Sequence, residues 1–583
     1  MSAILSVDDL NDFISPGVAC IKPIETLPTA ASAPSDNTNP SNEFEVILDG
    51  QQPEAKTNAP PAEISLTDCL ACSGCVTSAE AVLVSLQSHN EVLNVLDSAP
   101  ALKLVGPGAD GKYSVEGLEN DAAKLYIASV SPQSRASLAA ACGNGVTEQQ
   151  AGRMIEQLFM GEQGLARGGK WGNKFTWVVD TNTAREATLV LGSDEVLGEG
   201  SIAPTDKAAT PVLTASCPGW VCYAEKTHPY VLPNLSRVKS PQALMGTLLK
   251  TSLSRILNIS PDRIWHLAVM PCFDKKLEAS REELTDAVWA GDGKPGRGVR
   301  DVDCVITSKE ILMLAASRDL NFFGLPASAP TQTPRFPDPS IHDFLFRPGR
   351  RQHSREAGTS GGNMHFILRN LQEKNPGSQI QTVPGRNADV VEYKVIAESG
   401  EVMFKAARYY GFRNIQNLVR KLKPAKASRM PGGKPFGSAK RPAGKSNGLD
   451  YGYVEVMACP GGCTNGGGQI KVDDPVVVDR KGLAVKPGPL EQKEWQKEVD
   501  EAYFSGDEPD SEAQGDGADL VVDGISPSHI RNVLTHWSTL TGIQLERLAY
   551  TSYREVVSDV GKEKKMTDTE RVVQLAGKIG GGW

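Results

Sequence analysis

Short apolar segments of strand length recur along most of the chain. They are rich in β-branched and aromatic residues, which favour strands over helices. The segments lie at 124–130, 175–179, 211–216, 263–270, 301–307, 390–396 and 451–457. Helical patterns lie between many of them, and strands that alternate with helices are typical of parallel α/β layers. The pattern therefore predicts an α/β fold in which parallel sheets are flanked by helices.

The clearest helical pattern covers residues 240–257. Ser240 is a suitable N-cap, and Pro241 fits the first helical position, where its missing N–H costs nothing. Apolar residues then recur on one face, at Met245, Leu249, Leu253 and Ile256. The spacing predicts one long helix that buries this face.

Composition and charge exclude several classes of protein. The chain has 583 residues, with 61 basic and 70 acidic side chains and a net charge of −9. An acidic chain is a poor ligand for a phosphate backbone, so we do not expect nucleic acid as a partner. No apolar run is long enough to cross a bilayer. Asp8, Asp9 and Asp12 stand where a secretory signal needs basic and apolar residues, so we expect a cytosolic or nuclear protein.

Three cysteines near the N-terminus have the spacing of iron–sulphur ligands. Cys69, Cys72 and Cys75 form C-x2-C-x2-C, the three-ligand core of a ferredoxin-type [4Fe–4S] motif, without its usual C-x3-C-P continuation. Cys20 is the only other cysteine before residue 142, so we assign it as the fourth ligand. Zinc is the alternative occupant of four cysteines. Eleven cysteines in a reducing compartment do not suggest a disulphide framework.

A second group of cysteines is dispersed along the chain. Cys217, Cys272 and Cys459 each follow an apolar strand-like segment, and Cys463 follows Cys459 in a Gly-rich loop. In an open α/β sheet, ligands collect at the carboxyl ends of the strands. The four residues are therefore candidates for one buried site, in which the glycines allow the backbone to approach an inorganic body. The alternative is that they are buried cysteines without a ligand.

Five sequence blocks resemble the large catalytic domain of iron-only ([FeFe]) hydrogenases. They are TASCPGW (214–220), MPCFDKKLE (270–278), DVDCVITSKEI (301–311), GTSGG (358–362) and MACPGGCTNGGGQ (457–469). Combined with the N-terminal C-x2-C-x2-C and a remote upstream cysteine, they resemble the Nar family, the nuclear prelamin A recognition factor-like proteins of cytosolic iron–sulphur assembly, in its fungal form. The resemblance covers roughly 1–25, 64–425 and 450–475 together with the C-terminal helical region.

The resemblance implies two [4Fe–4S] clusters. One is held by Cys20, Cys69, Cys72 and Cys75, and the other, more buried, by Cys217, Cys272, Cys459 and Cys463. Lys275 matches the lysine that contacts a diiron ligand in hydrogenases, and Glu278 matches a proton-relay carboxylate. Met270 and Met457 match the methionines beside the diiron unit. The sequence departs at Ser216, where hydrogenases have a proton-relaying cysteine. Because a serine hydroxyl is a far weaker acid than a thiol, we expect no hydrogenase activity.

The resemblance also implies a fold and a role. The expected fold is a two-lobed hydrogenase-like body with a small N-terminal cluster module and the second cluster between the lobes. The expected role is that of a non-enzymatic carrier or adaptor in cytosolic iron–sulphur assembly. The protein would link the early scaffold to a late targeting complex with a WD40-type subunit. Client apoproteins would be indirect partners. A redox enzyme or electron-transfer protein of the hydrogenase type is the alternative, and a zinc-stabilised interaction protein is a third.

These expectations divide the chain into eight segments. They are 1–26 with Cys20, a Pro/Ala/Ser/Asn-rich linker (27–63), the N-terminal cluster module (64–110), the two lobes (111–421, with loops at 285–300 and 324–354), a basic Gly/Pro-rich loop (422–450), a cluster-ligand segment (451–500), an acidic loop (501–524), and C-terminal helices with a flexible tail (525–583) that ends in Trp583.

Some candidate residues have less specific surroundings. Cys142, Cys222 and Cys304 are expected to be structural, with Cys222 as the only substitute ligand. His228, His266 and His365 have no spacing that suggests a metal site. Trp583, on a Gly-rich tail, is a candidate docking residue for a partner.

Overall fold

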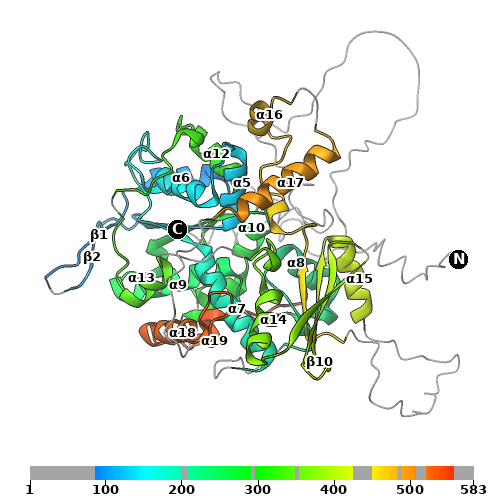
Figure 1. The fold of residues 1–583 in the computed structure, drawn as a ribbon. Coiled ribbons are helices and arrows are strands. Elements are labelled where there is room, and N and C mark those ends of the chain that lie inside the picture. The colour runs from blue at the N-terminus through cyan, green and yellow to red at the C-terminus, as the bar shows by residue number, and fades with distance from the viewer. Residues whose placement is uncertain are drawn as a thin grey trace, which may run out of the picture.

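Two β-sheets, each flanked by helices, form the body of the protein (Figure 1). The computed structural model describes residues 86–109, 111–199, 208–290, 296–331, 333–347, 354–385, 387–423, 450–483, 487–506 and 520–556. The two-lobed α/β body expected from the sequence is thereby confirmed.

The first sheet has four parallel strands in the order β4-β3-β6-β7. They are β4 (Trp177–Asp180), β3 (Leu125–Val130), β6 (Ile264–Met270) and β7 (Cys304–Thr307). Every residue of β3 and β6 is buried, as parallel strands covered on both faces require. All four strands fall on apolar segments that were predicted as strands: β3 and β6 agree to within one residue, whereas β4 and β7 begin two and three residues later than predicted.

Helices cover both faces of this sheet, and alternate residues of each strand contact opposite layers. Leu125 and Ile127 pack on one layer, while Tyr126 and Ala128 pack on the other. The first layer contains α7 (Thr181–Leu197), α9 (Pro241–Leu257), α13 (Pro339–Leu345), α18 (Pro527–Thr541) and α19 (Leu545–Ala549). The second contains α4 (His89–Ser98), α5 (Pro132–Cys142), α6 (Glu148–Met160), α12 (Ser308–Ala316) and α17 (Pro489–Tyr503).

The second sheet is mixed and has the order β5-β11-β10-β9-β8. Its strands are β5 (Val212–Leu213), β11 (Tyr453–Met457), β10 (Val402–Tyr410), β9 (Val390–Ile396) and β8 (Gln379–Pro384). β5, β11 and β10 are parallel, whereas β9 runs antiparallel to both of its neighbours. Helix α14 (Asn363–Lys374) packs on one face, and α8 (Pro218–Thr227) and α15 (Phe412–Leu422) pack on the other.

Smaller elements complete the described residues. The strands β1 (Lys103–Val105) and β2 (Ser114–Glu116) form an antiparallel pair. Short helices are α10 (Asp274–Ala279), α11 (Asp286–Trp289) and α16 (Pro475–Lys481), and the 3-10 helices are η1 (Pro229–Asn234), η2 (Pro261–Arg263), η3 (Glu282–Leu284), η4 (Phe322–Gly324), η5 (Arg355–Ala357) and η6 (Cys463–Asn465). Among the described helices, none has the length and apolar character needed to cross a membrane.

The predicted long helix is confirmed at its start. Helix α9 begins at Pro241, and the Ser240 hydroxyl oxygen accepts the Ala243 N–H at 3.4 Å. The buried residues extend beyond the predicted apolar face, because α9 packs against β6 of the sheet and also against α7 and α18, its neighbours in the same layer.

Other predicted boundaries differ from the structure. The segments expected as loops, 285–300 and 324–354, contain α11 and α13, which bury Trp289 and Phe344 in the first core. Helix α17 continues to Tyr503, past the boundary placed at residue 500. The C-terminal helical region ends at Ala549, after which residues 551–556 belong to no helix or strand. Helices α11 and α13 are short, so burial against the rest of the protein, and not a periodic sequence pattern, defines them.

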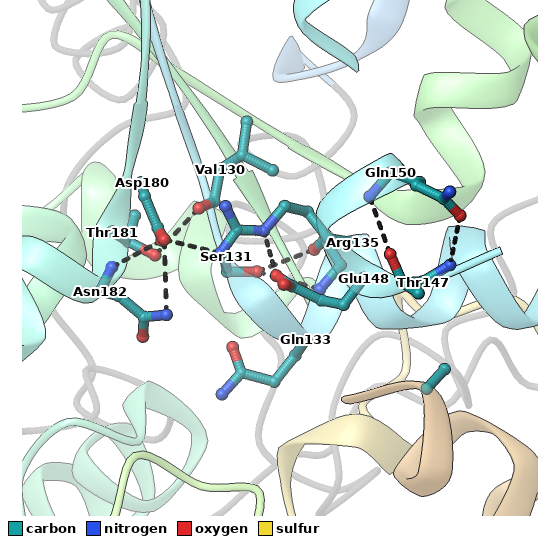
Figure 2. A network of polar contacts seen from close by, with 12 residues as sticks. Val130, Ser131, Gln133, Arg135, Thr147, Glu148, Gln150, Asp180, Thr181 and Asn182 are labelled. Carbon is teal, nitrogen blue, oxygen red and sulfur yellow. Dashed lines mark hydrogen bonds and ion pairs between the residues drawn. The ribbon is translucent and has the colours of Figure 1, made fainter. Parts of the chain in front are cut away.

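One buried arginine joins the second helical layer to the sheet at its carboxyl edge. Figure 2 shows Arg135 of α5 between Asp180, at the end of β4, and Glu148, in the first turn of α6. The Arg135–Asp180 distance is 2.8 Å, and Asp180 also accepts the Asn182 N–H at 2.8 Å as the N-cap of α7. The network therefore connects the starts of α5, α6 and α7 at the edge where parallel-sheet proteins place their ligands.

Candidate metal centre

Four cysteines lie at the carboxyl ends of strands from both sheets. Cys217 follows β5 and is the N-cap residue of α8, and Cys272 lies between β6 and α10. Cys459 follows β11, and Cys463 begins η6. Since β6 belongs to the first sheet and β5 and β11 belong to the second, the four residues are located between the two lobes.

The four thiols are close enough to influence one another's ionisation. Burial raises the pKa of Cys217 to about 12, and the charges of Cys463 and Asp274 add to this effect. Burial also raises the pKa of Cys272 well above its usual value, followed by the charges of Asp274 and of the other three thiols. The pKa values of Cys459 and Cys463 are raised first by burial as well. A group of four buried thiols is costly to ionise unless a cation compensates it.

Hydrogen-bond donors approach two of the sulphur atoms. The Ala458 N–H donates to Cys217 Sγ at 3.3 Å, and the Trp220 N–H also contributes a backbone hydrogen bond to this sulphur. The Ser360 hydroxyl faces the Cys463 sulphur and opposes the effect of burial on its pKa. Such donors stabilise a thiolate in preference to a thiol, so the surroundings suit a metal-bound sulphur.

Glycines allow the loops that carry the cysteines to approach each other. The Gly468 N–H donates to the Pro271 carbonyl at 3.0 Å, which joins the loop after β11 to the loop after β6. A Cβ atom at Gly466 would lie 2.3 Å from the Pro271 oxygen, and one at Gly462 would lie 2.5 Å from Thr359 Oγ1. Gly462 also has a φ of 111°, which a side chain would strain. The Gly-rich sequence is thus a requirement of close packing around the cysteines.

Helix α17 covers the loop that begins with η6, at Cys463. The Thr464 hydroxyl donates to Asp500 at 2.6 Å, and the Gln496 amide donates to Thr464 at 2.9 Å. The Trp495 indole N–H donates to the Ile470 carbonyl at 2.9 Å, just beyond the loop. The helix therefore holds the loop from outside through both polar and apolar contacts.

A cavity of about 80 Å³ lies beside Cys463. Its walls include Met270, Met457 and Ser216, all of which the sequence placed around this site. Lys275 also lines it and donates to the Ser216 carbonyl at 3.0 Å and to Glu278 at 2.7 Å. The residues that match the surroundings of the hydrogenase diiron unit are thus gathered here, but a serine stands in place of the thiol.

The arrangement does not resemble the shell of one metal ion. Across the described part of the chain, no three His, Cys, Asp or Glu side chains are grouped as ligands of a single ion. Four thiols that interact electrostatically without converging on one point fit a larger inorganic body, such as a cluster.

The remaining candidates have separate environments. Cys20, Cys69, Cys72 and Cys75 lie outside the described residues, as does Trp583. Cys304 is buried in the second core, Cys142 ends α5 near Arg480, and Cys222 lies in α8 near Arg281. The histidines each contact a polar side chain: His228 contacts Tyr223, His266 contacts Ser129, and His365 contacts Asp523.

Three residues near the thiols received no role from the sequence. Asp274 is buried and raises the pKa of all four thiols. Ser360 hydrogen-bonds to Cys463, and the charge of Glu455, on β11, raises the pKa of Cys463. Ser360 belongs to the GTSGG block, which could have identified it. Glu455 could have been identified as a lone carboxylate within an apolar strand, because a charged residue in such a strand is buried only with a polar partner.

Comparison with known proteins gives consistent similarities. Residues 124–467 match the family model of the iron-only hydrogenase large subunit, C-terminal domain. The chain is similar to the cytosolic Fe-S cluster assembly factor nar-1 of Neurospora crassa, with 91% identity over 583 residues and full coverage of both chains. It is also similar to the factors named NAR1 in Chaetomium globosum (73% identity) and nar1 in Emericella nidulans (54% identity), again with full coverage of both chains.

Solved structures show the same fold at low identity. An [FeFe]-hydrogenase studied for its inactivation by oxygen is 21% identical, with a TM-score of 0.52, and the match covers 80% of this chain and 99% of that one. A variant of the apo [FeFe]-hydrogenase HydA1 from Chlamydomonas reinhardtii is 20% identical, with the same TM-score and coverage. At this identity the similarity concerns the fold alone.

Proposed function

Because this chain belongs to the NAR1 family of cytosolic Fe-S cluster assembly factors, we propose that it serves cytosolic iron–sulphur protein assembly by holding two [4Fe–4S] clusters and linking the early scaffold to the late targeting complex. The observation that carries this proposal is the meeting of four cysteine thiols from strand ends of both sheets. A [4Fe–4S] cluster, when bound, supplies four iron sites for thiolates and accepts or releases one electron.

Cys217, Cys272, Cys459 and Cys463 are the proposed ligands of one cluster. Their thiols are buried together, backbone N–H groups donate to Cys217, and the glycines of the loop allow a close approach. Each ligand is held by a strand end or a helix start, so little backbone freedom remains to be lost on binding. This cluster is therefore expected to be the more stable of the two.

Cys20, Cys69, Cys72 and Cys75 are the proposed ligands of the other cluster. The support is the C-x2-C-x2-C spacing and the remote upstream cysteine, since these residues lie outside the described part of the chain. A cluster held by one short segment and one distant residue is expected to be more labile.

Assembly, and not hydrogen chemistry, is the proposed activity. The relatives are named as assembly factors, and Ser216 replaces the thiol that relays protons in hydrogenases. Partners are proposed to be the cytosolic scaffold proteins and a targeting complex with a WD40-type subunit, which passes clusters to client apoproteins. A redox enzyme of the hydrogenase type remains the second candidate, since Lys275, Met270 and Met457 line a cavity beside Cys463.

Metal analysis of the anaerobically purified full chain tests the proposal. We expect about eight iron atoms and eight acid-labile sulphides per chain. Cys272→Ala and Cys72→Ala should each remove about half of the iron, whereas Cys142→Ala, a thiol at the end of α5, should leave the iron unchanged. Stoichiometric zinc would contradict the cluster assignment. Extra iron with carbonyl or cyanide infrared bands, or hydrogen evolution, would support the hydrogenase alternative.

A further inference from the structure

A line of three side chains connects the sulphur of Cys463 to a buried carboxylate in the second sheet. The Ser360 hydroxyl oxygen accepts the Cys463 N–H at 3.1 Å, and its hydroxyl group also interacts with the Cys463 sulphur. Ser360 hydrogen-bonds in turn to the Tyr410 hydroxyl. The Tyr410 hydroxyl donates to Glu455 Oε1 at 2.5 Å. Ser360, Tyr410 and Glu455 are all buried, at 6%, 3% and 2% exposure.

Each hydroxyl in this line has one hydrogen and two neighbours. A hydroxyl can accept twice but donate only once. When Tyr410 donates to an ionised Glu455, its oxygen is free to accept the Ser360 hydrogen, and Ser360 then has none for Cys463. When Glu455 is protonated, it donates to Tyr410, Tyr410 donates to Ser360, and Ser360 donates to the Cys463 sulphur. The Cys463 sulphur therefore receives a hydrogen bond from Ser360 when Glu455 is protonated and receives none when Glu455 is ionised.

Opposing influences act on the ionisation of Glu455. Burial raises its pKa, while the Met364 N–H and the Tyr410 hydroxyl, followed by the charges of Arg408 and His365, lower it. The Met364 N–H donates to Glu455 Oε2 at 2.9 Å. Arg408 is its direct neighbour on β10, and Tyr453 lies two residues away on β11. The charge of Glu455 also raises the pKa of Tyr393 on β9. No ion pair of Glu455 is found among the described residues.

We propose that Ser360, Tyr410 and Glu455 form a hydrogen-bond switch that controls whether the sulphur of Cys463 receives a hydrogen bond, and thereby sets the reduction potential of the iron–sulphur cluster at that cysteine. The inference rests on the proposed function, because it assumes a cluster held by Cys463. Ser360 is the residue that contacts the ligand, and Tyr410 and Glu455 are positioning residues that act through it.

The consequence is a cluster whose reduction is linked to one proton. A hydrogen bond donated to a ligand sulphur stabilises the reduced, more negative state and raises the potential. On reduction the cluster takes one electron from the external reductant, and Glu455 binds one proton from water. The potential is therefore higher at acidic pH than at alkaline pH.

Redox titration of the full chain with dithionite, followed by electron paramagnetic resonance, tests the switch between about pH 5.5 and 8.5. The signal of this cluster is identified by its loss in Cys272→Ala. In the unmodified protein, the potential should rise as the pH falls. In Ser360→Ala the donor is gone, so the potential should stay at the low, alkaline value at every pH. In Tyr410→Phe no acceptor competes for the Ser360 hydrogen, so the potential should stay at the high, acid value.

Two further variants separate the switch from a packing effect. Ser360→Thr keeps the hydroxyl and should retain the pH dependence. Tyr453→Phe removes a buried hydroxyl that contacts Thr214 on the same sheet, and it should leave the potential unchanged. Potentials that are independent of pH, or that shift in the same direction in Ser360→Ala and Tyr410→Phe, overturn the switch. Absence of any Cys272-dependent cluster signal contradicts the proposed function instead.

Discussion

At the scale of single residues, buried lysines with carboxylate partners surround the first sheet. Lys239 contacts Asp301 at 2.9 Å, Lys250 contacts Asp303 at 2.7 Å, and Lys276 contacts Glu310 at 2.7 Å. The pairs are costly to desolvate, so each is weak evidence of stability, but removal of one partner leaves an uncompensated charge. Lys276 also donates to the Gln87 carbonyl, which ties the segment before α4 to α10, the helix that follows Cys272.

Lys276→Met is expected to lower the free energy of unfolding by about 3–5 kcal/mol, because Glu310 would remain buried with its charge unpaired. Lys497→Met is the matched control, since its pair with Glu501 is exposed and 3.6 Å long, and it should cost less than about 1 kcal/mol. Urea unfolding of the cluster-loaded protein measures both. The double variant Lys276→Met/Glu310→Gln should recover part of the loss, and an equal effect of the two single lysine variants would refute the argument.

At the scale of elements, helix α17 is the outer wall of the candidate metal centre. It contributes Trp495 and Val499 to the second core and contacts the loop that begins at Cys463 through Thr464. Its polar and apolar contacts lie on the same side, so the helix and the loop are held as one unit. Movement of α17 would therefore expose the cysteine loop to solvent.

Trp495→Ala is expected to cost about 3–5 kcal/mol of stability from the lost burial, and to accelerate iron release from the cluster at Cys463. The physical reason is that the indole both fills the core and holds the Ile470 carbonyl, next to the loop. Iron transfer to a chelator, followed by absorbance, measures the rate. Trp171→Ala, at a side chain that is 46% exposed, is the control and should release iron at the rate of the unmodified protein. Unchanged release from Trp495→Ala would show that α17 does not protect the site.

At the scale of the whole molecule, the candidate metal centre lies where the two sheets meet. Cys272 comes from the first sheet, and Cys217, Cys459 and Cys463 come from the second. An inorganic body bound there would cross-link the two lobes, so its binding free energy would also stabilise their packing. The N-terminal cysteines lie outside the described residues.

Cys272→Ala is therefore expected to lower the melting temperature and the yield of the folded protein, whereas Cys72→Ala should lose iron but leave a folded body with a nearly unchanged melting temperature. Differential scanning calorimetry and metal analysis on the same samples measure the two effects. An equal loss of folded protein from both substitutions would mean that both sites are coupled to folding, against the assignment of a stable and a labile site.

The amino-acid sequence by itself determined the elements whose residues show a clear local pattern. Seven strands were predicted from runs of β-branched and aromatic residues, and α9 from Ser240, Pro241 and its apolar spacing, because such patterns depend only on near neighbours. The four strand-end cysteines were also visible in the sequence, since parallel strands of α/β proteins present their carboxyl ends to ligands.

Only the tertiary structure decided what depends on contacts between distant residues. Weak local patterns are found in the strands β8 and β10 and in the helices α11 and α13, which are defined by pairing or by burial against the rest of the protein. The antiparallel pairing of β9 between β8 and β10 and the packing of α17 over the cysteine loop likewise depend on distant residues. The same holds for the line from Cys463 through Ser360 and Tyr410 to Glu455. Its members lie on η6, on the loop before α14 and on two neighbouring strands, and a hydrogen bond depends on distances that sequence spacing does not contain.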